Sequence, residues 1–198
     1  MGMWPIRRRY GPYAWSRTSQ AFYDTLIQFV GREDRVLEFG SSTGHISFRL
    51  AREGYRVSLL DIRAEPINEA RQLFAQAGVH AQFFVEDFLQ HNGSYDVLWN
   101  SGLIQCLLAE QRQQVLRYAA TLSRRLLLFY PDTDSSKKVC GADNSKIPGV
   151  GDAVEYSVAD LPELFCRYYD NVYWGRLPAE KLAVPFDMFW LQGDKTNG

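Results

Sequence analysis

A short loop of small residues follows an apolar run near residue 40. The segment Val36-Leu37-Glu38-Phe39-Gly40-Ser41-Ser42-Thr43-Gly44 places an acid inside the run and glycines after it. Gly40 and Gly44 can adopt backbone angles that a Cβ forbids, so the backbone there can approach a ligand closely. The segment predicts a ligand-binding turn. An ordinary strand-to-helix loop, which also favours Gly and Ser, is the alternative.

Two further acids stand where later apolar runs end. Asp61 lies 21 positions after Gly40, the spacing at which an acid at the end of a second strand accepts both hydroxyls of a ribose. Asp87 ends the next run and is placed to meet the exocyclic amine of a base. Taken singly, Asp61 can be a helix N-terminal acid and Asp87 a loop residue. Their placement at consecutive strand ends predicts an adenosine-shaped site.

Apolar runs alternate with helix-periodic segments, and these elements must position the acids. We expect five strands, at 36–39, 56–60, 81–85, 95–99 and 126–130. Helices are expected after the first, second and fourth strands, and one more before the first strand, from residue 19. Strands that alternate with helices at this spacing indicate crossover units and a parallel sheet. Two later β-rich runs, 172–177 and 186–192, favour an antiparallel pair at the sheet edge. Ligands bind such sheets beyond the carboxyl ends of the strands.

The composition is that of an ordinary soluble protein. The chain has 198 residues, 46% of them hydrophobic, with a formal net charge of −1, which gives no electrostatic reason to expect nucleic acid. Cys106, Cys140 and Cys166 are far apart, so neither disulfides nor a metal site are expected. No run has the length of a membrane span and no secretory signal is seen, which favours a cytoplasmic protein.

Two segments depart from the alternating pattern. Residues 1–31 combine an aromatic-rich arm with the first helix, and we expect them to form a cap on a main domain of residues 32–198. Residues 132–152 are rich in Asp, Ser, Lys, Gly and Asn. We interpret 132–152 as a lid or substrate loop, with simple disorder as the alternative.

The run from Asp34 to Pro131 resembles the core of the class I S-adenosylmethionine-dependent methyltransferases. The matching pieces are VLEFGSSTGHIS, VSLLDI, FFVEDF, YDVLWNSGLIQCL and RRLLLFYPD. The resemblance implies an α/β fold with a doubly wound, mostly parallel seven-stranded sheet, helices on both faces and an antiparallel strand at one edge. It also implies S-adenosyl-L-methionine as cofactor and transfer of its methyl group to an acceptor, which we expect to be a small molecule.

The resemblance also implies roles for single residues. Glu38 would lie near the methionyl part of the cofactor, Asp61 would hold the ribose and Ile62 would pack on the adenine. The implied cofactor-binding residues at the strand ends are Glu38, Gly40, Ser41, Ser42, Gly44, Asp61, Ile62, Asp87, Phe88, Asn100, Ser101 and Gly102. Ser42 departs from the family, which usually has glycine there; a serine is tolerated if its φ is negative.

Residues outside the strand ends are candidates for closing the site and for catalysis. Tyr10 and Tyr13 could cover the cationic sulfonium with aromatic faces, and Arg17 could meet a carboxylate. Packing of the arm onto the body is the alternative for the tyrosines. Methyl transfer from a sulfonium is an in-line displacement for which positioning can suffice, and the candidate catalytic residues are His91, Asp132 and Tyr13.

Two other functions remain open. A non-catalytic adenosyl-binding subunit that regulates a partner would need no catalytic base. A nicotinamide-linked oxidoreductase is less favoured, because the second and third glycines of its phosphate-binding motif would fall on Ser42 and His45.

For the oligomeric state, we expect a monomer or a homodimer.

Overall fold

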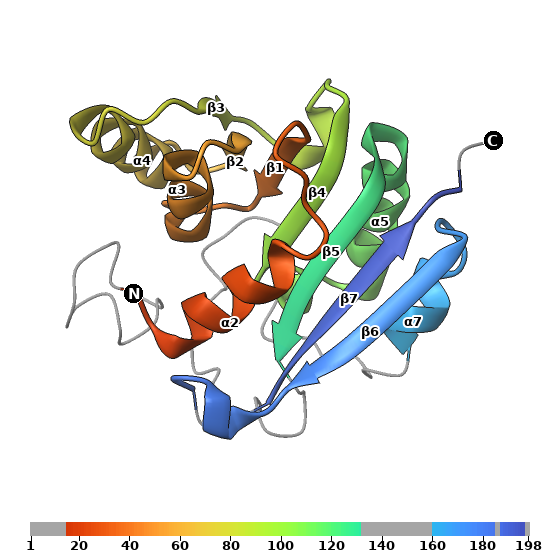
Figure 1. The fold of residues 1–198 in the computed structure, drawn as a ribbon. Helices are drawn as coiled ribbons and strands as arrows, with labels where there is room; N and C mark the ends of the chain where they lie inside the picture. The colour runs from red at the N-terminus through yellow and green to blue at the C-terminus, as the bar shows by residue number, and fades with distance from the viewer. Residues whose placement is uncertain (1–14, 132–159, 185–186, 197–198) are drawn as a thin grey trace.

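A seven-stranded sheet of order β3-β2-β1-β4-β5-β7-β6 organises the chain (Figure 1). The computed structural model describes residues 15–131, 160–184 and 187–196. The strands are β1 Arg35–Phe39, β2 Arg56–Asp61, β3 Gln82–Val85, β4 Tyr95–Ser101, β5 Ser123–Pro131, β6 Asn171–Leu177 and β7 Met188–Asp194. The helices are α2 Arg17–Leu26, α3 His45–Arg52, α4 Ala64–Gln76, α5 Ala109–Leu122 and α7 Asp160–Phe165, with short 3-10 turns η1 Phe88–Gln90, η2 Ile104–Cys106 and η4 Ala179–Lys181.

The predicted fold class is confirmed. The pairs β1–β2, β1–β4, β2–β3 and β4–β5 are parallel, whereas β7 is antiparallel to both of its neighbours, β5 and β6. The structure adds one detail to the expected edge pair. The last strand in sequence, β7, lies between β5 and β6, so β6 forms the edge of the sheet.

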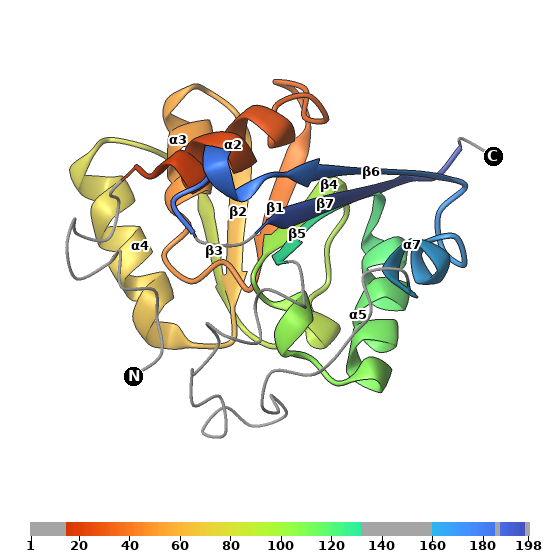
Figure 2. The ribbon, with the colours of Figure 1, turned by 90° about the horizontal axis from the view of Figure 1, so that it is seen from below.

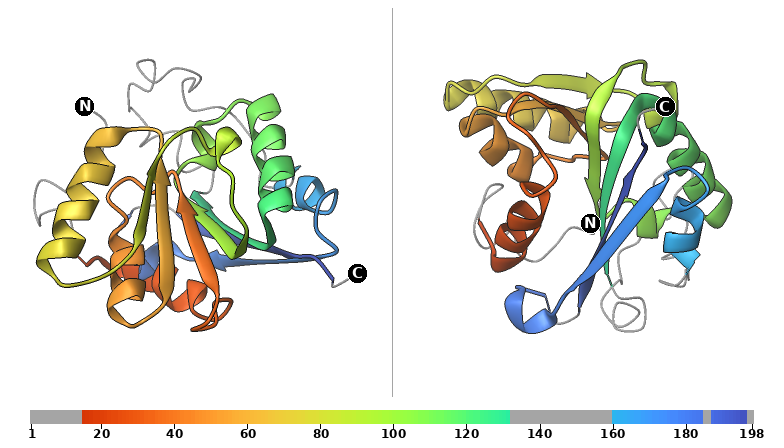
Figure 3. Two further views of the ribbon diagram at one scale, coloured as in Figure 1. Left: turned by 90° about the horizontal axis from the view of Figure 1, so that it is seen from above. Right: turned by 45° about the vertical axis from the view of Figure 1, so that its right-hand side comes forward.

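Helices cover both faces of the sheet (Figures 2 and 3). On one face α2, α3 and α4 bury side chains such as Leu26, Ile46 and Phe74 against the sheet. On the other face α5 and α7 bury Leu116 and Phe165. The central strands therefore consist of nearly unbroken apolar runs, as strands buried on both sides require.

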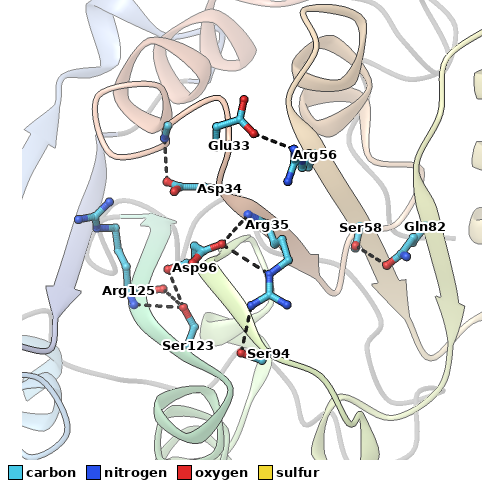
Figure 4. A network of polar contacts seen from close by, with 11 residues as sticks. Glu33, Asp34, Arg35, Arg56, Ser58, Gln82, Ser94, Asp96, Ser123 and Arg125 are labelled. Atoms are coloured by element: carbon cyan, nitrogen blue, oxygen red, sulfur yellow. Dashed lines mark hydrogen bonds and ion pairs between the residues drawn. The ribbon is translucent and has the colours of Figure 1, made fainter. Parts of the chain in front are cut away.

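A polar network joins the strands at their amino ends (Figure 4). The backbone N–H of Arg35 donates to Asp96 Oδ2 at 2.8 Å, and the Ser123 hydroxyl donates to the Asp96 carbonyl at 3.0 Å. These bonds join the starts of β1, β4 and β5. Because these three strands are parallel, alignment of their amino ends also aligns their carboxyl ends at the opposite edge of the sheet.

Several expected features fall outside the described residues. The aromatic arm with Tyr10 and Tyr13, and the 132–152 segment with Asp132, belong to this part of the chain. The division of the chain at residues 31 and 32 stays a prediction; α2 packs directly against α3, where the Ser19 hydroxyl and His45 Nε2 are 3.0 Å apart. The helices in the described ranges are each too short or too polar to cross a bilayer.

Arg125 gives a test of how the two ends of the chain are joined. Its guanidinium donates to the Phe29 carbonyl at 2.6 Å and to Asp194 Oδ1 at 2.8 Å, in a partly buried setting. We expect Arg125→Met to lower the free energy of unfolding by about 1–2 kcal/mol, because two charge-assisted hydrogen bonds are lost. Urea unfolding measures this change.

Arg56→Met is the matched control for Arg125→Met. Arg56 pairs with Glu33 on the surface, where the two side chains are 65% and 83% exposed. Such exposed pairs contribute little, so the control should change stability by about 0.5 kcal/mol or less. Equal losses in both variants would contradict the assignment of a structural role to Arg125.

Candidate functional site

The candidate site lies at the carboxyl edge of the sheet, opposite the network of Figure 4. The connections that leave β1, β2, β3 and β4 all start at this edge, because these strands are parallel. The edge therefore gathers the loop 40–44, Asp61, Asp87 and the end of β4 with Asn100 and Ser101.

The loop after β1 has a backbone of alternating left-handed residues. Gly40, Ser42 and Gly44 have φ values of 61°, 52° and 62°. A Cβ on Gly44 would overlap Cδ2 of Leu59, and one on Gly40 would lie 3.0 Å from Leu103 Cδ2. Both glycines are therefore required by conformation and by packing.

The sequence led us to expect a negative φ at Ser42, and this expectation is wrong, because the φ of Ser42 is positive. In the described part of the chain it is the one non-glycine residue with a positive φ. Its N–H donates to Asp61 Oδ2 at 2.8 Å, and the N–H of Ser41 donates to the Leu60 carbonyl at 2.9 Å. These bonds to the end of β2 hold the loop in its shape and compensate for the left-handed serine.

Asp61 is buried and accepts hydrogen bonds on both oxygens. Oδ2 accepts from the Ser42 N–H and from Arg63 Nη2, at 2.8 and 3.2 Å. Oδ1 accepts from the backbone N–H and from Nε of Arg63, at 2.9 and 3.0 Å. The side chain of Asp61 is 4% exposed and that of Arg63 is 42% exposed. A buried acid is thus paired with a guanidinium that reaches solvent.

Glu38 places a carboxyl beneath the loop. The residue is 6% exposed, and its Oε2 has no hydrogen-bond partner in the described part of the chain. The pKa of Glu38 is raised to about 8, chiefly by burial and to a smaller extent by the Asp61 carboxylate, while hydrogen bonding from Ser47 offsets part of the shift. The contact between the Ser47 hydroxyl and Glu38 falls outside normal hydrogen-bond geometry, and this hydroxyl has no other partner among the described residues.

Trp99 adds a second unpaired group beside Glu38. The two residues are aligned across β1 and β4, so their side chains share one face of the sheet. Trp99 is fully buried, and its Nε1, like Glu38 Oε2, lacks a partner among the described residues. A buried carboxyl with one oxygen unpaired fits a cationic ligand group, since such a group would satisfy that oxygen and favour the ionised form of the acid.

Asn100 joins the ends of β4 and β1. It is fully buried; its Nδ2 donates to the Phe39 carbonyl at 2.6 Å, and its Oδ1 accepts from the Leu103 N–H at 3.0 Å. Nδ2 would also lie 3.2 Å from a Cβ on Gly40. Asn100 therefore holds the start of the loop, at Phe39 and Gly40, against the end of β4. Ser101 and Gly102 follow it toward β5, where the Gly102 N–H donates to the Phe129 carbonyl at 3.4 Å.

An exposed apolar surface lies beside Asp61. Ile62 is 60% exposed and Val85, which is aligned with Asp61 in the sheet, is 40% exposed. Asp87 caps η1 by accepting from the Leu89 N–H at 2.9 Å. The Phe88 ring is buried and stacks on Phe39 at 4.3 Å, so this side chain belongs to the core. The exposed aliphatic carbons could pack on the flat face of a base.

The remaining candidates lie elsewhere. His91 is buried, with Nδ1 2.6 Å from Glu86 Oε1 and Nε2 2.7 Å from the Tyr95 hydroxyl. The ring also packs on Phe84 at 4.7 Å, so both ring nitrogens and one ring face are engaged within the fold. The exposed Arg17 donates to the Glu180 carbonyl at 3.3 Å. Tyr10, Tyr13 and Asp132 lie outside the described residues.

Sequence reasoning did not identify Arg63, Ser47 and Trp99. Arg63 carries a usable signal: it follows Asp61 by two positions and occupies the N-cap of α4, where Ser, Thr, Asp or Asn is usual. Ser47 and Trp99 carry none, because only the sheet register and the placement of α3 bring them to Glu38. Across residues 15–131, 160–184 and 187–196, no group of three or more His, Cys, Asp or Glu residues could hold a metal ion.

Comparison with known sequences gives two matches. A family model described as a methyltransferase domain matches residues 36–125, which include the loop, Asp61, Asp87 and Asn100. A segment of 68 residues is 41% identical to the ubiquinone biosynthesis O-methyltransferase of Cronobacter sakazakii. That match covers 32% of this chain and 28% of the relative, so the similar region spans under a third of the relative's length.

Solved structures share the complete fold. Magnesium protoporphyrin IX methyltransferase from Synechocystis PCC 6803, with bound S-adenosylhomocysteine, superposes with a TM-score of 0.75 at 18% identity, over 99% of this chain and 89% of that one. A 1,6-didemethyltoxoflavin-N1-methyltransferase from Burkholderia thailandensis, with bound 1,6-didemethyltoxoflavin and S-adenosylhomocysteine, gives 0.73 at 18% identity, over 97% and 83% of the two chains.

The left-handed Ser42 gives a test of the loop. A left-handed conformation costs an L residue about 1–2 kcal/mol, and glycine avoids this cost. Glycine also increases the entropy of the unfolded chain, which offsets part of the stabilisation. We expect Ser42→Gly to raise the free energy of unfolding by about 0.5–1 kcal/mol in urea denaturation. Ser41→Gly is the control and should be destabilising, because it only adds unfolded-state entropy. Destabilisation by both changes would be inconsistent with a left-handed Ser42.

Proposed function

We propose that this chain, which matches a methyltransferase-domain model over residues 36–125, is a class I S-adenosylmethionine-dependent methyltransferase that transfers a methyl group from S-adenosyl-L-methionine to a small-molecule acceptor. The observation that carries the proposal is the buried carboxyl of Glu38, whose Oε2 has no hydrogen-bond partner among the described residues, next to a loop with three left-handed residues. A cofactor with an ammonium group and a sulfonium suits such a carboxyl. A pyrophosphate, which is negatively charged, does not.

Each part of the proposed cofactor has a matching group at the carboxyl edge. Asp61 supplies carboxylate oxygens for the ribose hydroxyls, and the exposed Ile62 supplies an apolar surface for the adenine. Glu38 and the backbone of 40–44 face the methionyl part, with Asn100 fixing the loop beneath it. The two structural relatives named above bind S-adenosylhomocysteine, the product of this cofactor, in the same fold.

Positioning supplies the chemistry in this proposal. The methyl group of a sulfonium transfers by in-line displacement, and a site that aligns the acceptor and excludes water can provide most of the acceleration. The ring of His91 is held by Glu86 and Tyr95, so a structural role explains it without catalysis. Tyr13 and Asp132 remain candidate groups for the acceptor side.

A small-molecule acceptor is supported by the relatives. Ubiquinone biosynthesis, magnesium protoporphyrin IX and 1,6-didemethyltoxoflavin appear in their names, and each points to a small organic acceptor. The formal net charge of −1 gives no electrostatic basis for binding nucleic acid. We propose a cytoplasmic enzyme that acts as a monomer or homodimer.

Calorimetry and methyl transfer test the proposal in two steps. We expect S-adenosylmethionine and S-adenosylhomocysteine to bind and NAD not to bind. No binding of either adenosyl compound at high micromolar concentration would exclude the proposal. Radiolabelled methyl incorporation over a metabolite panel then tests catalysis. Binding without any acceptor would favour the alternative, a non-catalytic adenosyl-binding regulatory subunit.

Asp61→Asn tests the ribose contact. The change removes one acceptor and the charge, so we expect S-adenosylhomocysteine to bind at least about tenfold more weakly. Asp96→Asn is the matched control, because Asp96 lies at the opposite edge of the sheet (Figure 4). It should leave the affinity unchanged, and similar losses in both variants would indicate a general loss of structure.

Glu38 predicts a proton linkage. At pH 7 a carboxyl with a pKa of about 8 is mostly protonated, and a bound ammonium favours its ionised form. Binding of S-adenosylhomocysteine should therefore release most of one proton, and affinity should rise with pH toward about 8. Calorimetry in buffers of different ionisation enthalpy counts the protons. Glu38→Gln should release none, and an unchanged proton count in that variant would contradict the assignment.

The same carboxyl predicts how stability depends on pH. Its pKa is about 8 in the fold against an ordinary value of 4.5, so between these values the folded chain binds more protons than the unfolded chain. Stability should therefore fall as pH rises through this window. We expect the free energy of unfolding, measured in urea without cofactor, to fall between pH 5 and pH 8 in the wild type. The fall should be smaller in Glu38→Gln, which lacks the titrating group. A pH slope equal in both proteins would argue against the shifted pKa.

A further inference from the structure

The Asp61 carboxylate is saturated by groups of the chain itself. It accepts four hydrogen bonds, two on each oxygen. A carboxylate offers roughly four lone-pair sites, so its accepting capacity is full. Two of the donors are backbone N–H groups, of Ser42 and Arg63, and belong to the frame of the loop and of α4. The other two are Nε and Nη2 of the Arg63 side chain.

The Arg63 fork has the donor pattern that a ribose would bring. Nε donates to Oδ1 and Nη2 to Oδ2, one bond to each oxygen, at 3.0 and 3.2 Å. The two adjacent hydroxyls of a ribose also carry two donors, which a carboxylate accepts in the same way. Both cannot bind at once, because the carboxylate has no further acceptor sites. We propose that Arg63 is an intramolecular competitor of the cofactor's ribose and sets the affinity of this site.

The local structure explains why Arg63 can bind and leave. It occupies the N-cap of α4, where it makes no side-chain cap, and its backbone N–H bonds to Asp61. The Arg63 side chain therefore does not cap the helix, and it lies only two residues from Asp61 in the sequence. At 42% exposure the guanidinium can move into water, so its departure costs little compared with that of a buried ion pair.

This inference rests on the proposed function and adds a regulatory element to it. A ligand that must displace a competitor loses affinity in proportion to the fraction of molecules in which the competitor is bound. Removal of the Arg63 side chain should therefore tighten cofactor binding. A guanidinium that contacts the cofactor, or that only orients Asp61 for it, predicts the opposite result, a loss of affinity.

Calorimetry on a matched pair of variants tests the direction of the effect. Arg63→Met keeps the length of the side chain and removes its donors, and we expect S-adenosylhomocysteine to bind about two- to tenfold tighter at pH 8. Arg71→Met is the control: Arg71 lies on the same helix, bonded to Asn68 and to the Phe83 carbonyl, and its removal should leave affinity unchanged. Unchanged or weaker binding to Arg63→Met overturns the inference.

A pair of nucleosides tests whether the ribose is the competitor. Adenosine carries both hydroxyls, and 2′,3′-dideoxyadenosine carries neither. Arg63→Met should tighten binding of adenosine and leave that of the dideoxy compound unchanged. Equal gains for both ligands would assign the effect to general charge or access and overturn competition at Asp61.

The outcomes separate this inference from the proposed function. If the wild type and Arg71→Met bind no adenosyl compound and Arg63→Met binds none either, the proposed function fails and the inference with it. If all three bind equally, the function stands and the inference fails. A double-mutant cycle in urea unfolding, with Arg63→Met and Asp61→Asn, tests the contact without ligand: a coupling energy indistinguishable from zero would show that the fork is not formed.

Discussion

The hydrogen bond from the Ser42 N–H to Asp61 is the contact on which the carboxyl edge of the sheet depends. It fixes the loop after β1 to the end of β2, and it holds a serine in a left-handed conformation that costs about 1–2 kcal/mol. The same carboxylate accepts the backbone N–H of Arg63 at the start of α4. One buried side chain thus positions a loop, a strand end and a helix, which is why its capacity to accept further bonds matters to any ligand.

The two edges of the sheet differ in how their polar groups are treated. At the amino edge, Asp96 and Ser123 satisfy backbone and side-chain groups and align β1, β4 and β5 (Figure 4). At the carboxyl edge, Glu38 is buried without a partner for Oε2, and the loop carries left-handed residues. Unpaired buried groups and backbone strain are unfavourable for the fold alone, and both are typical of binding sites. The hydrogen bonds of Asp96 and Ser123 therefore stabilise the fold at the edge opposite the candidate site.

The electrostatics of the site connect its two acids. Asp61 raises the pKa of Glu38, in addition to the larger effect of burial, and the Arg63 guanidinium compensates the charge of Asp61. A cationic cofactor would bring positive charge to Glu38 while its ribose replaced Arg63 at Asp61. The protonation of one acid and the pairing of the other would therefore change together. Binding and charge at this edge are coupled through two side chains on neighbouring strands.

The sequence by itself determined the alternation of strands and helices, the glycine loop and the acids at strand ends, because hydrophobic periodicity and glycine placement are local properties. It also indicated that Asp61 and the loop share an edge, since parallel strands end together. Only the tertiary structure decided the insertion of β7 between β5 and β6, the positive φ of Ser42 and the placement of Trp99 beside Glu38. Each of these depends on contacts between distant segments: strand pairing fixes the register, the Asp61 carboxylate fixes Ser42, and burial under α3 leaves Glu38 without a partner for Oε2.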